Sequence, residues 1–249
     1  MMRSRIKAAI GGSAVMAVLA GTLALSGGVA AVSDLQFQNR ILSLRDASSV
    51  RVDVEMSDGD IQLGGGSRSL MNGDFFYNVN EWRPNVHYVV NDGMGTLRLR
   101  QGESSSFVAP WDMDEVENKW DVRLTDERPV DLKVELGSGT GTLLLGDLDL
   151  TGFTVEAGAG EATIDFTNTH GRDVNGRIEG GAGPIAVKLP QHVGVQVTVD
   201  EGSGNVDVSG LHRQGNVYVN DVYGTAPVTL HLEVEGGAGD IDLEMVPAR

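Results

Sequence analysis

The sequence predicts an all-β protein, a β-solenoid built like a single-stranded β-helix stack of short strands, preceded by one N-terminal signal or transmembrane helix. Three observations lead to this fold class. A glycine-punctuated motif recurs along the chain, apolar residues keep one parity around its copies, and a basic start with a long uncharged run precedes the first copy. Self-similarity at a nearly fixed spacing is the signature of stacked repeats.

The N-terminal region has the features of a segment that directs export. Arg3, Arg5 and Lys7 lead into an uncharged run of 25 residues, 8–32. A basic start, an apolar stretch and small residues near its end are typical of a cleaved secretory signal. The run also exceeds the ~20 residues that a helix needs to cross a bilayer. Both a signal peptide and a retained anchor stay open, and in either case we expect an exported chain, secreted or membrane-anchored facing outside.

The composition narrows the function classes. The net charge is −16, and without the three N-terminal basic residues there remain 16 basic against 35 acidic residues, or −19. A surface of this sign repels nucleic acid, so we expect no nucleic-acid partner. The absence of cysteine excludes disulfides, thiolate metal sites and cysteine nucleophiles. We expect no cofactor.

Each repeat reads as a strand, a Gly-x-Gly turn and a second strand. Copies end at Gly59, Gly139, Gly160, Gly183, Gly204 and Gly239, with a degenerate copy at Gly95. From Gly139 onward the spacings are 21, 23, 21 and 35 residues, about one β-helix coil each except the last. We expect these five copies to stack as consecutive coils, with the glycines supplying the positive φ angles of a tight turn.

Apolar residues occupy equivalent positions in nearly all copies. The residue seven before the last glycine is apolar except at Gly176, and the residue five before is apolar in every copy: Val54, Val90, Val134, Val155, Ile178, Val199 and Val234. Intervening positions are mostly polar, such as Asp53 and Lys133. Period two with one wet face is the half-buried strand pattern.

We expect three segments: residues 1–32 as signal peptide or transmembrane anchor, 33–128 as an N-terminal β domain with an aromatic-rich insertion, and 129–249 as the repetitive β-solenoid. The insertion reads FFYNVNEWRPNV over 75–86, and all three tryptophans fall between positions 82 and 120. Two interpretations stay open. The aromatics plug the core and cap the end of the stack, which the exposed edges of an open stack favour, or they line a ligand site.

Several segments resemble the toast-rack family. They are residues 76–79 (FYNV), 81–84 (EWRP), 95–101 (GTLRLRQ), 120–124 (WDVRL), 129–134 (PVDLKV), 137–139 (GSG) and 148–151 (LDLT). The resemblance implies that residues 33–128 are an N-terminal toast-rack domain, followed by a β-slice region similar to cell-wall-active antibiotic response proteins of the Lia type. It implies an envelope-stress role with an envelope protein or sensor kinase as partner, and it brings no catalytic motif.

The residues themselves show no catalytic pattern. None of the five histidines, His87, His170, His192, His212 and His231, has zinc-ligand spacing. No serine stands in a nucleophile elbow. We therefore expect that the protein is not an enzyme.

One recurring feature exceeds what stacking requires. An acidic residue stands four before the last glycine in six copies: Glu55, Glu135, Glu156, Glu179, Asp200 and Glu235. Parity points these side chains outward, and stacking would align them at the ~4.8 Å strand spacing. Like charges directly opposite each other destabilise a sheet. Three interpretations stay open. Neighbouring arginines compensate the charges, or the column binds a divalent cation or a basic partner, which makes it the candidate metal site, or these are merely polar residues that flank a turn.

These observations predict a non-enzymatic extracytoplasmic cell-envelope protein with a structural, sensing or regulatory role. The N-terminal segment would associate it with the membrane. The alternative is a surface adhesin or ligand-binding module that uses a β-face for glycan or protein ligands, with cation dependence.

Overall fold

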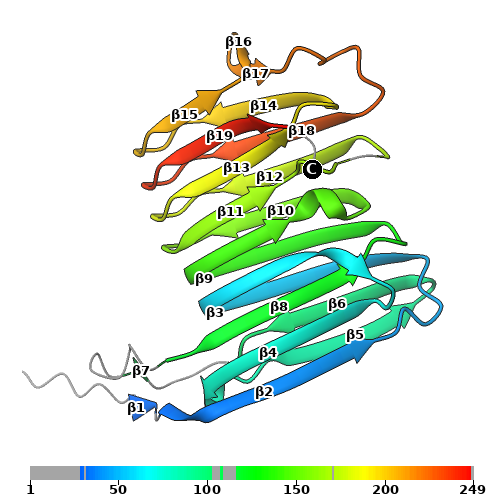
Figure 1. Cartoon of the computed structure of the whole chain (residues 1–249), viewed down its shortest axis with the longest axis vertical. Helices are drawn as coiled ribbons and strands as arrows, with labels where there is room; N and C mark the ends of the chain where they lie inside the picture. The colour runs from blue at the N-terminus through cyan, green and yellow to red at the C-terminus, as the bar shows by residue number, and fades with distance from the viewer. Residues whose placement is uncertain (1–28, 31, 103–106, 109–115, 170, 248–249) are drawn as a thin grey trace, which may run out of the picture.

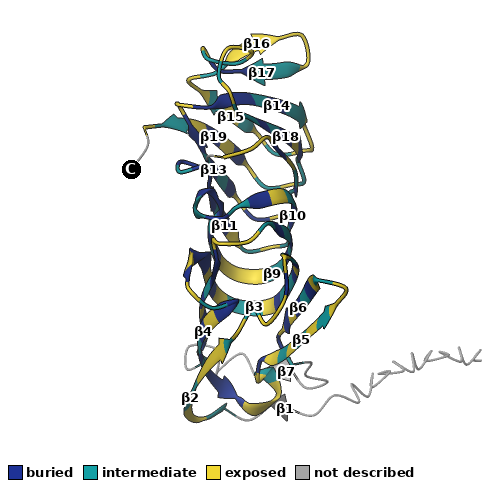
Figure 2. Cartoon of the chain, turned by 90° about the vertical axis from the view of Figure 1, so that its right-hand side faces the viewer, coloured by how far each residue is buried: buried dark blue, intermediate teal, exposed yellow. Residues whose placement is uncertain are grey.

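The chain folds into two β-layers that lie face to face and enclose the apolar side chains (Figures 1 and 2). The structure is a computed structural model that describes residues 29–30, 32–102, 107–108, 116–169 and 171–247. Most of the predicted signal or anchor lies outside these residues, as do Trp111 and His170. Within the described ranges, no helix is long and apolar enough to span a membrane. The predicted all-β class is confirmed.

The first layer holds the first strand of each of the six full repeats. Both strands of the degenerate copy around Gly95 also lie in this layer and pair antiparallel, so the prediction that this copy is a repeat is wrong. In spatial order its strands are β5 (Asn85–Asn91), β6 (Met94–Arg100), the first half of β3 (Ser49–Ser67), the first half of β9 (Val130–Leu144), β10 (Leu150–Ala157), β12 (Val174–Glu179), β18 (Thr229–Glu235), β14 (Gly194–Asp200), β17 (Val217–Val219) and β16 (His212–Gln214).

The second layer holds the second strand of each repeat. Its spatial order is β2 (Val32–Leu42), β4 (Met71–Val79), β8 (Asn118–Thr125), the second halves of β3 and β9, β11 (Glu161–Asp165), β13 (Ile185–Pro190), β19 (Ile241–Val246) and β15 (Val206–Ser209). Two short 3-10 turns, η1 (Asn80–Trp82) and η3 (Leu145–Asp147), and the pair β1 (Val29–Ala30) with β7 (Phe107–Val108) complete the described elements.

Pairing is parallel through the middle of the stack and antiparallel at its ends. β9, β10, β12 and β18 pair in parallel in one layer, and β9, β11, β13 and β19 do so in the other. At one end β2, β4 and β8 pair antiparallel, as do β5 and β6, and at the other end β17 pairs antiparallel with β14 and β16. Parallel neighbours contributed by successive repeats are the arrangement expected of stacked coils.

The expectation of strictly consecutive coils is wrong for the last two repeats. The final repeat, β18 and β19, lies between the repeat of β12 and β13 and the repeat of β14 and β15 (Figure 1). The chain between Ser209 and Thr229 includes β16 and β17. This long connection leads from the end of β15 back to the space between β12 and β14, where β18 lies. The longer spacing of 35 residues between Gly204 and Gly239 therefore reflects the connection that places the final repeat between two earlier ones.

The turn glycines are required mainly for close stacking. Positive φ angles occur at Gly59 (125°) and Gly139 (106°), but not at the turn glycines of the later repeats, where that prediction is wrong. There the reason is space: a Cβ on Gly160 would stand 2.1 Å from the carbonyl oxygen of Gly139, and one on Gly183 would stand 1.8 Å from that of Gly160. Each turn also donates to the one below, as from the Ala182 N–H to the Gly158 carbonyl at 2.8 Å.

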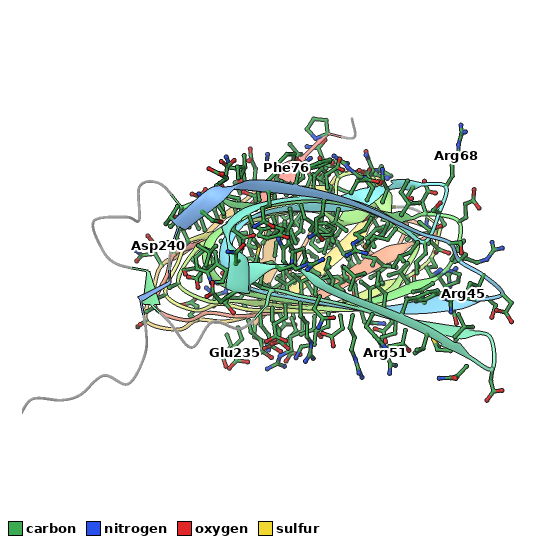
Figure 3. The ribbon with its side chains drawn as sticks, turned by 90° about the horizontal axis from the view of Figure 1, so that it is seen from below. Arg45, Arg51, Arg68, Phe76, Glu235 and Asp240 are labelled. Atoms are coloured by element: carbon green, nitrogen blue, oxygen red, sulfur yellow. The ribbon has the colours of Figure 1, made fainter. Side chains whose placement is uncertain are left out.

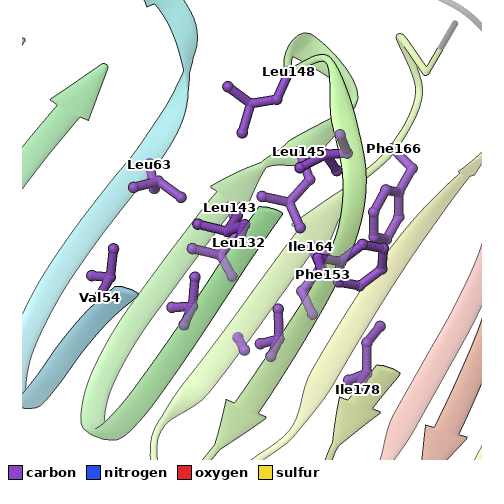
Figure 4. Packing of buried hydrophobic residues seen from close by; sticks show 14 of the residues in the cluster. Val54, Leu63, Leu132, Leu143, Leu145, Leu148, Phe153, Ile164, Phe166 and Ile178 are labelled. Carbon is purple, nitrogen blue, oxygen red and sulfur yellow. The ribbon is translucent and has the colours of Figure 1, made fainter. Parts of the chain in front are cut away.

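The core runs the length of the stack as one cluster. Val54, Leu132, Phe153 and Ile178 point into it from the first layer, facing residues such as Leu63, Leu143 and Ile164 of the second (Figure 4). The parity prediction is confirmed at these positions, which are at most 5% exposed. Gly176, the one exception, makes room for a neighbour, because a Cβ there would stand 2.0 Å from the ring of Phe153.

The aromatic-rich insertion closes the core near the β2 end. Phe75, Tyr77 and Trp120 are buried, and the rings of Phe75 and Trp120 meet edge to face with centroids 5.5 Å apart. This confirms the plug for these three residues. Phe76 and Trp82 are only half-buried and line surface cavities instead.

Replacing Gly183 by alanine should destabilise the fold, because its Cβ would clash with backbone rather than with a movable side chain. We expect a loss of about 1–3 kcal/mol in the free energy of unfolding, the usual cost of overpacking, measured by urea denaturation of the full chain.

The matched control is Gly152→Ala on β10. Its Cβ would have its nearest contact at an ordinary 3.6 Å, so we expect a change within about 1 kcal/mol, of either sign. Equal effects of the two substitutions would show that turn stacking does not require Cβ-free residues.

Candidate functional site

The six predicted acidic residues form one column on the outer side of the first layer. The strand register places Glu55 beside Glu135, Glu135 beside Glu156, and Glu156 beside Glu179. Beyond them come Glu235 and then Asp200. The alignment expected from parity is therefore confirmed, whereas Asp200 is not next to Glu179, because the final repeat inserts Glu235 between them. We call these six residues the acidic column.

Lys133 joins two members of the column. It stands two residues before Glu135 on β9, so its side chain points to the same side of the sheet. Its ammonium lies 2.6 Å from the Oε1 atom of Glu135 and 2.8 Å from that of Glu156 on the next strand. Hydrogen bonds to these two carboxylates raise the pKa of Lys133 above its usual value. The lysine stays charged and offsets the repulsion between the two glutamates.

Arg177 repeats this arrangement two strands further along. It stands two residues before Glu179 on β12, with its Nε atom 2.6 Å from the Oε1 atom of Glu179. Its guanidinium also pairs with Glu235, and with Glu233 at 2.9 Å. The hydrogen bond to Glu179 and the attraction of Glu233 raise the pKa of Arg177. One guanidinium, which can donate up to five hydrogen bonds, thus serves three carboxylates.

The remaining members sit at the two ends of the column. Arg100, opposite Glu55 in the register, places its Nε atom 3.2 Å from the Oε2 atom of that carboxylate. Asp200, at the other end, forms no ion pair with any described residue. Five of the six carboxylates therefore have a cationic partner from the chain itself.

The negative charges of the acidic column are thus largely compensated by basic side chains of the same chain. The sequence suggested neighbouring arginines but did not single out Lys133, Arg177 or Arg100. A usable signal existed for the first two, since a basic residue two positions before an acidic member must share its side of the sheet. No such rule identifies Arg100, which reaches Glu55 only because β6 pairs with β3.

The metal hypothesis stays a prediction. Among the residues that the structure describes, no three His, Asp or Glu side chains are grouped so as to hold a metal ion. Three of the described histidines have separate partners: His192 lies 2.9 Å from the Thr169 carbonyl oxygen, His212 lies 2.6 Å from Asp221, and His231 lies 2.8 Å from Gln196.

Replacing Arg177 by methionine should lower the melting temperature, because Glu179, Glu233 and Glu235 lose their shared cation. The loss should be larger at low ionic strength than in ~1 M salt, where screening reaches within ~3 Å. Arg51→Met is the control, since Arg51 is more exposed and, among the described residues, pairs only with Asp131. An equal loss at both salt concentrations would contradict an electrostatic role for Arg177.

If the acidic column also binds a divalent cation, we expect this at its Asp200 end, where the carboxylate is unpaired. Calcium chloride added to the full chain should then give heat in titration calorimetry and raise the melting temperature, and Asp200→Asn should reduce both effects. Asp207→Asn on β15, in the other layer, is the control. Neither heat nor a shift with the unaltered chain would remove the cation hypothesis.

Comparison with solved structures finds a strong likeness. A crystal structure from Clostridium sporogenes ATCC 15579, named as a candidate cell adhesion protein, is 27% identical with a TM-score of 0.80, over 85% of this chain and 100% of that chain. A candidate adhesin from Bacteroides fragilis NCTC 9343 is 10% identical with a TM-score of 0.23, over 84% and 97% of the two chains. A likeness this weak carries no argument. No curated protein sequence matches this chain.

Comparison with protein families finds a model that matches this chain. The model described as the N-terminal domain of toast_rack, DUF2154, matches residues 30–188. This match spans more than half of the chain and includes β3, β4, β8 and β9, around which the two layers are built. The chain therefore belongs to the toast-rack family, through its N-terminal domain.

Proposed function

We propose that this protein is a non-enzymatic binding module of the cell envelope, exposed outside the cytoplasmic membrane and adhesin-like in its action. The observation that carries the proposal is the pair of long outer β-faces, on which side chains align in columns from strand to strand. Stacked repeats of this kind create extended surfaces suited to a macromolecular ligand. A small-molecule enzyme more often uses a deep, concave site.

Two further observations support the proposal. The Clostridium sporogenes structure, covered over its whole length by this chain, is named as a candidate cell adhesion protein. The charges of the acidic column are mostly paired within the chain, which suits a preformed surface better than a reactive centre. The structural, sensing or regulatory role expected from the Lia-type resemblance, with a sensor kinase as partner, stays a separate prediction.

Exposure outside the membrane is tested with an epitope tag after Arg249 of the full chain. An antibody should label the tag on intact protoplasts, because the folded region would face outward. A cytoplasmic protein with the same tag is the control and should be labelled only after permeabilisation. Labelling of this protein only after permeabilisation would contradict the proposal.

The binding role is tested separately, with the full chain purified in detergent and mixed with isolated cell walls. We expect the native chain to co-sediment with the walls, and a heat-denatured sample serves as the control. A native chain that stays in the supernatant would contradict a role as a binding module for the envelope.

A further inference from the structure

A surface groove lies on the second layer near the β2 end, on the side opposite the acidic column. Figure 3 shows Phe76 on one outer side of the molecule and Glu235 on the other. The groove begins as a cavity of about 400 Å³ lined by the side chains of Asp60, Gln62, Phe76, Lys119, Asp121 and Thr142, among others. A second cavity of about 590 Å³ shares Asp60 and Lys119 with it and reaches Trp82. The two cavities are therefore neighbours on this face, and we call them together the groove.

Strand register brings these residues together from distant parts of the chain. Phe76 of β4 pairs with Lys119 of β8, which pairs with Asp60 of β3, which pairs with Thr140 of β9. In the neighbouring row, Asp121 pairs with Gln62 and Gln62 pairs with Thr142. Because Phe75 and Trp120 point into the core, their neighbours Phe76, Lys119 and Asp121 must point outward.

The aromatic part of the groove is wider than one ring. Phe76 packs against Phe37 of β2 with ring centroids 4.9 Å apart and planes at 34°. Phe37 itself is 57% exposed, and its neighbours Leu35 and Ile41 on the same strand are 53% and 64% exposed. Clustered apolar exposure of this kind marks interaction sites on soluble domains. The two tilted rings offer an apolar surface beside the polar residues of the groove.

Two charged residues of the groove, Lys119 and Asp121, are paired within the chain, whereas the carboxylate of Asp60 has no ion pair with any described residue. The ammonium of Lys119 lies 3.2 Å from Glu117, and the Nε atom of Arg123 lies 3.1 Å from Asp121. A charged ligand would have to compete with these pairs. A neutral ligand would leave these pairs intact, and its hydroxyl groups could donate hydrogen bonds to the carboxylate of Asp60.

Three uncharged polar side chains of the first cavity have no partner among the described residues. Gln62, Thr140 and Thr142 form no side-chain hydrogen bond with any described residue. Together with the carboxylate of Asp60, they present both donors and acceptors towards the groove. A ligand rich in hydroxyl groups satisfies such a set, and the C–H face of a sugar ring fits against an exposed aromatic ring.

We propose that this groove binds a neutral oligosaccharide, with one sugar ring on Phe76 and its hydroxyl groups on Asp60, Gln62 and the threonines. The proposal rests on the binding role given above and names its ligand class and its site. The acidic column takes no part in it.

The test uses an array of immobilised neutral oligosaccharides, followed by titration calorimetry of the full chain with the strongest soluble hit. Phe76→Ala should weaken binding at least about tenfold, as truncation of a central aromatic anchor does. Asp60→Asn and Gln62→Ala should each weaken it several-fold through lost hydrogen bonds. Val89→Ala, an exposed apolar residue of the first layer, is the matched control and should leave the affinity within about twofold.

The exposed Asp60 and Gln62 variants keep the test valid if Phe76→Ala fails to fold. No binding to any oligosaccharide of the array would overturn the inference, as would binding that all three variants leave unchanged. A lysine- or arginine-rich decapeptide that bound instead, and was lost with Asp60→Asn, would also overturn it. In each case, retained co-sedimentation with cell walls would show that the binding role itself survives.

Discussion

The close approach of neighbouring Gly-x-Gly turns is the contact on which the rest of the structure depends. From Gly139 to Gly239, a Cβ on the last turn glycine would stand between 1.8 and 2.1 Å from a carbonyl oxygen of the adjoining turn. The turns therefore stack at the spacing of the strands, with backbone hydrogen bonds between them. Since each turn joins the two layers, its position sets the register of both strands of its repeat at once.

Common register turns a repeated sequence into aligned columns. Apolar columns meet between the layers and form the core, while the acidic residues meet on the outside, where their repulsion would oppose stacking. Lys133 and Arg177 each bridge carboxylates on adjacent strands and thereby convert a destabilising row into a series of ion pairs. On the other outer face near the β2 end, the register brings Asp74 beside Asp121, and Asp121 pairs with Arg123. There the antiparallel strands β4 and β8 bring an aromatic ring and unpaired polar side chains into one groove.

Period two and the glycine spacing were enough to predict the fold class, the inward residues such as Val134 and Ile178, and the alignment of the acidic column. The place of the final repeat could not be read in this way, because β18 satisfies the same pattern whether it lies between β12 and β14 or beyond β14. The groove was also out of reach. Which of Phe75 and Phe76 points outward depends on the exact strand register. Asp60 meets Lys119 only because β3 pairs with β8, and the two residues are 59 positions apart in the sequence. The domain boundary at residue 128 stays a prediction, although β3 pairs with β9 across it.

Amide hydrogen exchange at the turns tests the central claim most directly. The N–H groups of Ala159, Ala182 and Ala238 lie in surface turns, yet each donates to a carbonyl of the adjoining turn at 2.7–2.8 Å. The account predicts that these amides exchange as slowly as those of the core strands, because only opening of the stack exposes them. Exchange at the rate of an open loop, while the strand amides remain protected, would contradict it.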